Sequence, residues 1–371
     1  MGKVSKRNDR DVTSSNRAVN NGQGTQKANP DSEIVEVKFG KDVKGVKTRV
    51  IQTAQPAEAK VEKTSFWQVA KSHARRIFVE LLNLFFNHDW IFWLIGRVNK
   101  KLGLIESVFL VYPATADYMS AYSYAYRSRW HEWNPGPIGF FWQNGKLGVK
   151  FAISANNGKF SNPANKDKLC SLVERMEKLR MLFCANHKTF AGILPGILFL
   201  KRLVKETPEA DVTVEIVRQA IGRVILLEGL SKNTPIVVLG GRGFIGRRVV
   251  ASLIEDGCLV YCVDIAGENG QYAWPIHLRG KPVLLVNISL NSALSEYVHL
   301  LWPEVVILNE VYPEPCQELA WWLNAVGCRC YHVAGVKAGA LPSFPGGYHG
   351  GIPCCAAWHS PEMEVLLKKI V

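Results

Sequence analysis

Long apolar runs are missing from this sequence of 371 residues. The nearest candidate, residues 190–200, is too short and contains Pro195, whereas a membrane-spanning helix needs about 20 apolar residues. The first residues are polar and do not resemble a secretory signal peptide. We therefore expect a cytoplasmic protein, with contact at a membrane surface as the remaining membrane role.

Cysteine pairs spaced as metal-binding knuckles are also missing. The nine cysteines include Cys328 and Cys330, which alternate with His332 as on one face of a strand, but no Cys-x-x-Cys occurs. We predict no metal site. Nine cysteines in a chain of this length do not form a small disulfide framework, and without a signal peptide they indicate a reducing compartment.

Acidic residues are outnumbered, because 45 Lys and Arg face 32 Asp and Glu and give a formal net charge of +13. Such a balance favours an acidic partner: a phosphate-rich cofactor, a carrier protein, an anionic membrane or nucleic acid. Residues 1–63 are polar and poor in large apolar side chains, so we predict a disordered basic tail. A solvated tail accounts for much of the charge, and we identify no clear nucleic-acid site.

The composition changes at Ser65, and residues 64–103 form a segment of helical period that is unusually aromatic. Its apolar residues share one face, and its basic residues lie on the other side: Trp67, Ile77, Leu81, Leu84 and Phe85 against Lys71, Arg75 and Arg76. One interpretation is a helix at a membrane surface, through residues 66–98. The other is a helix packed on its own domain.

Residues 104–235 predict a smaller α+β domain. A strand is expected over 105–112, and a β-hairpin over 139–153 turns at Asn144-Gly145. Helices are expected over 166–184, 189–204 and 212–230. We expect this domain to bind substrate.

A dinucleotide-binding unit is predicted from residue 236 onward. The apolar run 236–240 is typical of a parallel strand buried on both faces. The glycine loop follows at once and consists of Gly240, Gly241, Arg242, Gly243, Phe244, Ile245 and Gly246. Helical period over 244–255, a strand over 259–263 and Asp264 complete the expected order.

Each part of this unit has a physical task. Gly241 permits the tight turn, Gly243 lets the backbone approach a pyrophosphate, and Gly246 lets the helix pack on the strand. The positive end of the helix dipole faces the phosphates. Asp264 would accept hydrogen bonds from the ribose, which favours NAD(H), while Arg242, Arg247 and Arg248 keep NADP(H) open.

Residues 236–335 resemble the cofactor domain of the extended short-chain dehydrogenase/reductase group in three places. These are the loop Gly-Gly-x-Gly-Phe-Ile-Gly, Val286-Asn287-Ile288 and the strand-like run 303–309. The resemblance implies cofactor contacts by Asn287, Ile288 and Asn309. The group's Tyr-x-x-x-Lys pair is absent, since Leu301 follows Tyr297 by four residues and Gly335 follows Tyr331. The resemblance therefore implies the cofactor-binding fold for this chain, but not the proton-transfer residues of the group.

The layout of a catalytic domain before a Rossmann unit resembles the aldehyde-forming long-chain acyl-carrier-protein reductases. Residues 184–191 are similar to their Asn/His/Thr-bearing segment, and residues 353–357 to their cysteine-containing helix, although Ser360-Pro361 interrupts it. The resemblance implies an acyl-accepting thiolate at Cys354 or Cys355, which a helix N-terminus would favour.

His187 or Lys188 would then donate a proton or polarise the carbonyl. The alternatives are purely structural: Cys354 and Cys355 as buried core residues, and His187 and Lys188 as a surface pair at a helix start. The glycine- and proline-rich stretch 335–351 is expected as a loop at the carboxyl ends of the strands, which makes Tyr348 and His349 cleft residues.

The sequence therefore predicts an α/β protein with a C-terminal Rossmann domain (236–371), a doubly wound parallel sheet, after the α+β domain and the tail. We expect an NAD(P)-dependent oxidoreductase, with an active site between the domains and an apolar or carrier-linked acyl substrate. Two alternatives stay open: a dehydrogenase of a small polar metabolite, and a non-catalytic NAD(P)-binding or sensing protein. The sequence leaves the oligomeric state open, and an oligomer is compatible with it.

Overall fold

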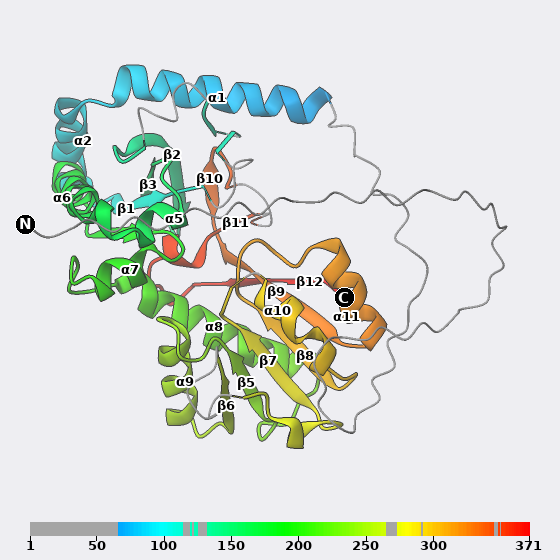
Figure 1. Ribbon diagram of the computed structural model, residues 1–371. Helices are drawn as coiled ribbons and strands as arrows, with labels where there is room; N and C mark the ends of the chain where they lie inside the picture. The colour runs from blue at the N-terminus through cyan, green and yellow to red at the C-terminus, as the bar shows by residue number, and fades with distance from the viewer. Residues whose placement is uncertain are drawn as a thin grey trace, which may run out of the picture. The chain divides into compact units, whose positions relative to one another are not determined.

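Two β-sheets organise the chain in the computed structural model (Figure 1). The structure describes residues 66–113, 119–120, 122–124, 132–264, 273–290, 292–344, 348 and 350–371. The predicted tail, residues 1–63, lies outside the described residues. From Ser65 to Val371 the chain forms one compact unit.

The first sheet has the order β10-β2-β3-β1-β4. Its strands are β1 (Ile105–Val111), β2 (Gly136–Gln143), β3 (Lys146–Ala152), β4 (His187–Phe190) and β10 (Gly339–Leu341). Strand β1 runs parallel to β3 and β4, and β2 and β3 form the predicted hairpin. Asn144 and Gly145 both have positive φ, as the two-residue hairpin turn requires.

Helices cover one face of this sheet. They are α2 (Asp89–Leu102), α5 (Asn157–Ser161), the short η1 (Pro163–Asn165), α6 (Lys166–Phe183) and α7 (Leu194–Leu200). Their shared core includes Phe92, Val108, Phe151, Leu172 and Phe183. Helix α1 (Phe66–Phe86) precedes them and lies against β2. The predicted aromatic segment is therefore two helices, which separate at Asn87-His88.

The helix expected over 189–204 is partly wrong. His187–Phe190 pairs with β1 as β4, and only Leu194–Leu200 is helical. Gly192, with φ of 57°, lies between the strand and the helix. The ladder with β1 supplies tertiary hydrogen bonds that outweigh the local helical period.

The second sheet has the order β11-β9-β8-β7-β5-β6, with β12 also on β9. Its strands are β5 (Ile236–Leu239), β6 (Val260–Val263), β7 (Val283–Asn287), β8 (Val305–Asn309), β9 (Arg329–Lys337), β11 (Gly351–Ile352) and β12 (Val365–Lys369). Strands β5 to β9 are parallel, and β11 and β12 are antiparallel to β9.

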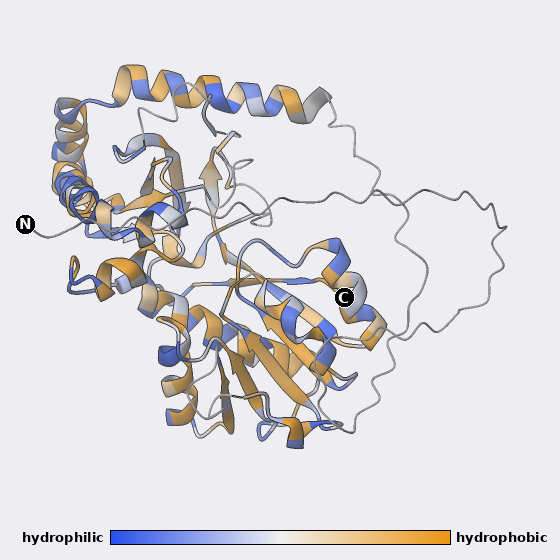
Figure 2. Cartoon of the chain, in the orientation of Figure 1, coloured by the Kyte–Doolittle hydropathy of each residue, from blue (hydrophilic) through white to orange (hydrophobic). Residues whose placement is uncertain are grey.

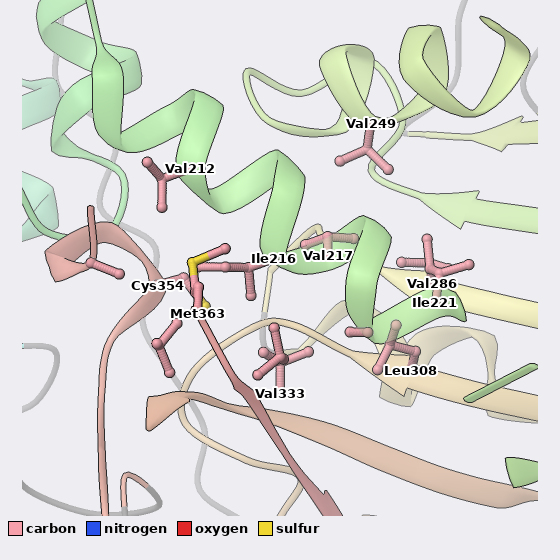
Figure 3. Close-up of a cluster of buried hydrophobic side chains, with 14 of the residues drawn as sticks. Val212, Ile216, Val217, Ile221, Val249, Val286, Leu308, Val333, Cys354 and Met363 are labelled. Carbon is pink, nitrogen blue, oxygen red and sulfur yellow. The ribbon is translucent and has the colours of Figure 1, made fainter. Parts of the chain in front are cut away.

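Helices pack on both faces of the second sheet. On one face α8 (Pro208–Leu227) and α9 (Gly246–Glu255) meet Val286, Leu308 and Val333 (Figure 3). The other face meets the short η2 (Ile276–Leu278), α10 (Ala293–Tyr297), η3 (Val298–Leu300) and α11 (Gln317–Val326). The predicted doubly wound α/β sheet is confirmed.

The strand order refines that prediction. Strands β6-β5-β7-β8-β9 follow the doubly wound order 2-1-3-4-5 and differ from the order 3-2-1-4-5-6 of dinucleotide-binding Rossmann domains. Within the described residues, no strand pairs with the outer edge of β6. The direction of winding reverses between β5 and β7, and in open α/β sheets ligands bind at such a switch point.

The two sheets exchange elements across residue 235, where the sequence suggests a domain boundary. Helix α8 comes before that point but packs on the second sheet. Strand β10 comes long after it and pairs with β2 of the first sheet. From the chain after β10, Phe344, Tyr348 and Cys355 line the space between the carboxyl ends of both sheets.

Candidate functional site

The glycine loop connects β5 to α9 at the carboxyl end of the second sheet. Gly240 has φ of 85°, and a Cβ there would lie 2.8 Å from the Ser289 Cα. A Cβ on Gly246, the first residue of α9, would lie 2.0 Å from the Gly240 carbonyl oxygen. A Cβ on Gly241 would lie 2.4 Å from the Cys262 Sγ. The loop therefore closes against β6, β7 and its own backbone only with glycine at these positions.

Three backbone N–H groups of this loop make no hydrogen bond to any described residue: those of Phe244, Ile245 and Gly246. They stand at the start of α9, where the helix dipole is positive. The Arg242 N–H donates to the Asp264 Oδ2 at 2.8 Å, which holds that carboxylate beside the loop. Unpaired N–H groups at a helix N-terminus form an anion-binding site.

A cavity of about 970 Å³ opens beside this loop. Its lining comes from the carboxyl ends of strands in both sheets, from the inner side of α1 and from the start of α8. The second sheet contributes residues 244–245, 288–290, 292 and 310–313, and the first sheet contributes residues 109, 111–113, 150, 152 and 191–193. The cavity thus extends from the glycine loop across the switch point to the first sheet.

Three carboxyl side chains line the cavity, those of Glu80, Glu209 and Glu310, and none was predicted. The last two have shifted pKa values. Glu209 is in the first turn of α8, is 2% exposed, and its Oε2 has no hydrogen-bond partner among the described residues. Burial raises the pKa of Glu209 to about 7, and the charge of Asp211 adds to the rise. Glu310 follows directly on β8, and burial raises its pKa to about 7 as well. Near neutral pH both groups can hold a proton and release it.

Cys355 lies near both carboxyls and lines the cavity, while Cys354 lies in the core of the second sheet and also reaches the cavity. The expectation of a lowered pKa is wrong for both. Burial raises the pKa of Cys355 to about 12 and that of Cys354 well above its usual range, and the Glu310 charge adds to each rise. Cys354–Ala356 forms a single 3-10 turn (η4) and supplies no helix dipole of useful length.

Lys150 on β3 is a buried basic residue of the cavity wall. Its ammonium group donates to the Pro342 carbonyl and lies 4.6 Å from the centre of the Phe344 ring. Burial lowers the pKa of Lys150 to about 7, with a smaller effect from Arg75. Pro342 and Phe344 belong to the segment that follows β10, so Lys150 ties this segment to the first sheet.

The structure separates His187 and Lys188 from the cavity. Both lie at the start of β4, and the cavity begins after its end, at Ala191. Lys188 is paired with Glu177 at 2.5 Å, and His187 lies 3.5 Å from Glu106. Because the strand carries them away from the cysteines, the predicted proton-donating role is wrong for this geometry.

Asn287 and Asn309 are buried side chains that bind each other. They are register partners on β7 and β8, and Asn287 donates to Asn309 at 2.7 Å. Asn309 also bonds His332 of β9, its own register partner. These side chains order the strand ends beneath the site, whereas a direct cofactor contact was expected. Ile288, in contrast, does line the cavity.

Tyr348 lines the cavity as predicted, stacked on Tyr312 with ring centres 4.7 Å apart. Burial raises its pKa well above the usual value, so its hydroxyl stays protonated. His349 lies outside the described residues. Arg248 is held by Asp211 at 2.9 Å and by Phe244, whereas Arg242 and Arg247 are exposed beside the loop. Among described residues, no cluster of three metal-ligating side chains occurs.

One local signal could have revealed Glu310. It directly follows a buried strand, and ligands of open α/β sheets bind at strand carboxyl ends. Glu209 gave no such signal, because a Glu in a first helical turn usually serves the helix dipole on the surface. Its burial results from contacts between distant segments.

Comparison with protein-family models gives no match, and no curated protein matches this chain. Among solved structures, the L-tryptophan dehydrogenase from Nostoc punctiforme is similar at 15% identity and a TM-score of 0.32. That comparison covers 61% of this chain and 69% of the dehydrogenase. A similarity this loose carries no argument about function.

Proposed function

We propose that this chain is an oxidoreductase that uses NAD(H) or NADP(H) and acts on an apolar substrate in the cavity. One observation carries the proposal: at a switch point the glycine loop presents three backbone N–H groups that bond no described residue, and its residues Phe244 and Ile245 also line the cavity. A pyrophosphate at the loop would leave the other end of a dinucleotide directed into that cavity.

The residues present fit such a cofactor. The N–H groups of Phe244, Ile245 and Gly246 suit a pyrophosphate, and Asp264 stands where a ribose hydroxyl would be bound. When bound, the nicotinamide would exchange a hydride with the substrate. The loops after β7 and β8, with Ile288 and Glu310, would flank it.

Reduction of a carbonyl requires a hydride at its carbon and a proton at its oxygen. The described side chains of this cavity whose pKa is shifted to about 7 are Glu209, Glu310 and Lys150. We assign the proton to Glu209, since its Oε2 is buried in the wall without a partner among the described residues. A general acid whose pKa is near the working pH accelerates such a step about 10²–10⁴-fold.

The acyl-thioester route through a cysteine thiolate has less support than direct reduction. With its pKa raised to about 12, Cys355 is almost entirely a neutral thiol at neutral pH. Thiolate is the nucleophilic form, so this environment disfavours attack on a thioester. The carrier-linked substrate therefore stays a hypothesis of its own.

Titration of the purified chain with the four dinucleotides, followed by NAD(P)H oxidation on panels of apolar aldehydes and ketones, polar keto acids and acyl thioesters, tests the proposal. We expect binding of one dinucleotide pair and turnover on the apolar carbonyl panel. Absence of binding would refute the proposal. Binding without turnover would favour a sensor, and turnover confined to keto acids would favour the dehydrogenase of a small polar metabolite.

Variants then test the residue roles. Glu209→Gln should reduce kcat about 10²-fold or more with unchanged dinucleotide affinity. The control Glu255→Gln, an exposed carboxylate at the end of α9, should change neither quantity. Cys355→Ser should retain carbonyl reduction, and complete loss of activity in that variant would restore the thiolate mechanism.

A further inference from the structure

Helix α1 is oriented with its polar side inward. Asn83 donates to the Pro137 carbonyl of β2 at 2.9 Å, and Glu80 and Asn83 line the cavity. Arg75 and Arg76 lie over the rings of Tyr122 and Tyr124. Of its apolar side chains, only Val79 is buried within the described part of the helix.

The outer side of α1 is apolar. Ile77, Leu81, Leu84 and Phe85 repeat at spacings of three and four residues, and each exposes between 48% and 62% of its surface. A surface helix of a globular protein normally turns such a stripe toward the core. Packing on its own domain, one of the two interpretations of this segment, therefore does not account for the stripe.

Helix α2 continues the pattern. It packs on α6 through Phe92 and through Gly96, where a Cβ would lie 1.9 Å from the Leu182 carbonyl oxygen. The opposite side exposes Trp90, Trp93, Leu94 and Val98. Figure 2 shows apolar residues recurring along both helices. We call this combined surface, Ile77, Leu81, Leu84, Phe85, Phe86, Trp90, Trp93, Leu94 and Val98, the aromatic face.

The charges around the aromatic face have one sign. Arg97 lies 4.7 Å over the Trp93 ring, and Lys100 and Lys101 follow in the last turn of α2. The acidic residues of these helices are directed elsewhere: Glu80 lines the cavity, and Asp89 is bound by Arg175 and Lys178 of α6. None of these three basic residues forms an ion pair with a described residue, so the face combines apolar and aromatic side chains with a positive rim.

We propose that the aromatic face docks on the surface of a bilayer rich in anionic phospholipid. Trp and Phe side chains suit the boundary between headgroups and acyl chains, and the basic rim would bind the headgroups. None of the helices within the described ranges is long and apolar enough to cross a membrane, so docking would be peripheral. Charge complementarity favours this occupant over a second copy of a chain whose own net charge is +13.

Docking would place the wall of the cavity beside the lipid. Val79, Glu80 and Asn83 line the cavity from α1, the helix whose outer side carries the exposed apolar stripe. An apolar compound dissolved in the bilayer would then have a short path to the cavity. The docking proposal itself does not depend on the proposed oxidoreductase function.

Co-sedimentation of the full chain with vesicles of phosphatidylcholine alone, and of phosphatidylcholine mixed with phosphatidylserine, tests the proposal. We expect binding to the mixed vesicles that weakens as salt is raised. Trp90→Ser with Trp93→Ser should abolish binding, and so should Leu84→Ser with Phe85→Ser. Arg97→Gln with Lys101→Gln should weaken binding to the anionic vesicles about tenfold or more, at roughly fivefold for each charge.

A matched control replaces exposed apolar residues elsewhere, Leu226→Ser with Trp321→Ser, and should bind as the wild type does. Circular dichroism establishes that each variant is folded. Failure of the wild type to bind anionic vesicles, or equal binding by folded variants of the aromatic face, would overturn the proposal. So would a wild-type dimer that the Trp90 and Trp93 variant converts to monomer, because the face would then be a protein interface.

Discussion

The glycine loop and the inner wall of the cavity present different polar groups: the loop presents backbone N–H groups, and the wall presents titratable side chains. The loop offers backbone N–H groups near solvent, and their positions depend on the absence of side chains at Gly240, Gly241 and Gly246. The inner wall offers the side chains of Glu209, Glu310 and Lys150, whose pKa values burial moves toward 7. Backbone N–H groups in the right positions are enough to bind an anion. Proton exchange near neutral pH requires a side chain whose pKa is shifted toward 7.

The largest effect is expected from a substitution in the glycine loop, where a side chain has the least room. Gly246→Ala would place a Cβ 2.0 Å from the Gly240 carbonyl oxygen, so the loop must open. We expect dinucleotide binding to fall at least about tenfold and the free energy of unfolding to fall by about 1–3 kcal/mol. Calorimetric titration and urea unfolding measure the two quantities.

Gly222→Ala is the matched control, because a Cβ at this exposed position of α8 meets nothing within 4 Å. It should bind dinucleotide normally and unfold at higher urea, by about 1 kcal/mol in the free energy of unfolding. Normal binding by Gly246→Ala would mean that the loop is not the phosphate site.

An intermediate effect is expected from the buried carboxyls. Their pKa of about 7 in the folded chain lies above the value of 4.5 expected when the chain is unfolded, so the folded state binds more protons between these pH values. Their stabilising contribution is complete below pH 4.5 and is lost as the pH rises to about 7. The loss amounts to about 3 kcal/mol for each carboxyl, at about 1.4 kcal/mol per pKa unit.

Urea unfolding of the wild type and of Glu209→Gln with Glu310→Gln across this range measures the difference. We expect the variant to lack most of the decline. Glu177, whose pKa is lowered to about 2 by hydrogen bonds from Arg180 and Lys188, loses its contribution only as the pH falls below 4.5 and so does not mask it. Parallel curves for the two proteins would show that the carboxyls ionise as they do in water.

The smallest effect is expected from His187→Gln with Lys188→Gln. Lys188 forms an ion pair with Glu177, and His187 lies 3.5 Å from Glu106, both at the far end of β4 from the cavity. Partly exposed pairs of this kind contribute at most about 1 kcal/mol. The turnover rate should stay within about twofold of that of the wild type. A hundredfold loss would show that His187 or Lys188 takes part in catalysis.

The glycine loop could be predicted from the sequence because its parts are contiguous. Strand β5, the glycines, α9, β6 and Asp264 occur within thirty residues, and local patterns specify each of them. The inner wall could not be predicted, because α8, β8 and the segment around Cys355 meet there only through the packing of the sheets. For Cys354 and Cys355, the sequence suggested a helix N-terminus, but tertiary burial sets the pKa instead.

The contrast between local patterns and contacts of distant segments also explains where the other predictions differ from the structure. The period of residues 189–204 is helical, yet Thr189 and Phe190 join a ladder whose partner, β1, is about eighty residues away. The apolar stripe of α1 was visible in the sequence, but its outward direction was not. That direction depends on distant contacts of the polar side. Asn83 donates to β2, Glu80 lines the cavity, and the arginines lie over tyrosine rings.

Strand β10 determines when the site can be completed during synthesis. The hairpin β2–β3 is made long before β10, and the edge of β2 is covered only after Gly339–Leu341 has been made. Until then that edge has unpaired backbone groups, which is an opportunity for wrong pairing with another chain. The cavity lacks Phe344 and Cys355 over the same period. A nascent chain therefore cannot complete the site until β10, Phe344 and Cys355 have been made, long after the hairpin that they contact.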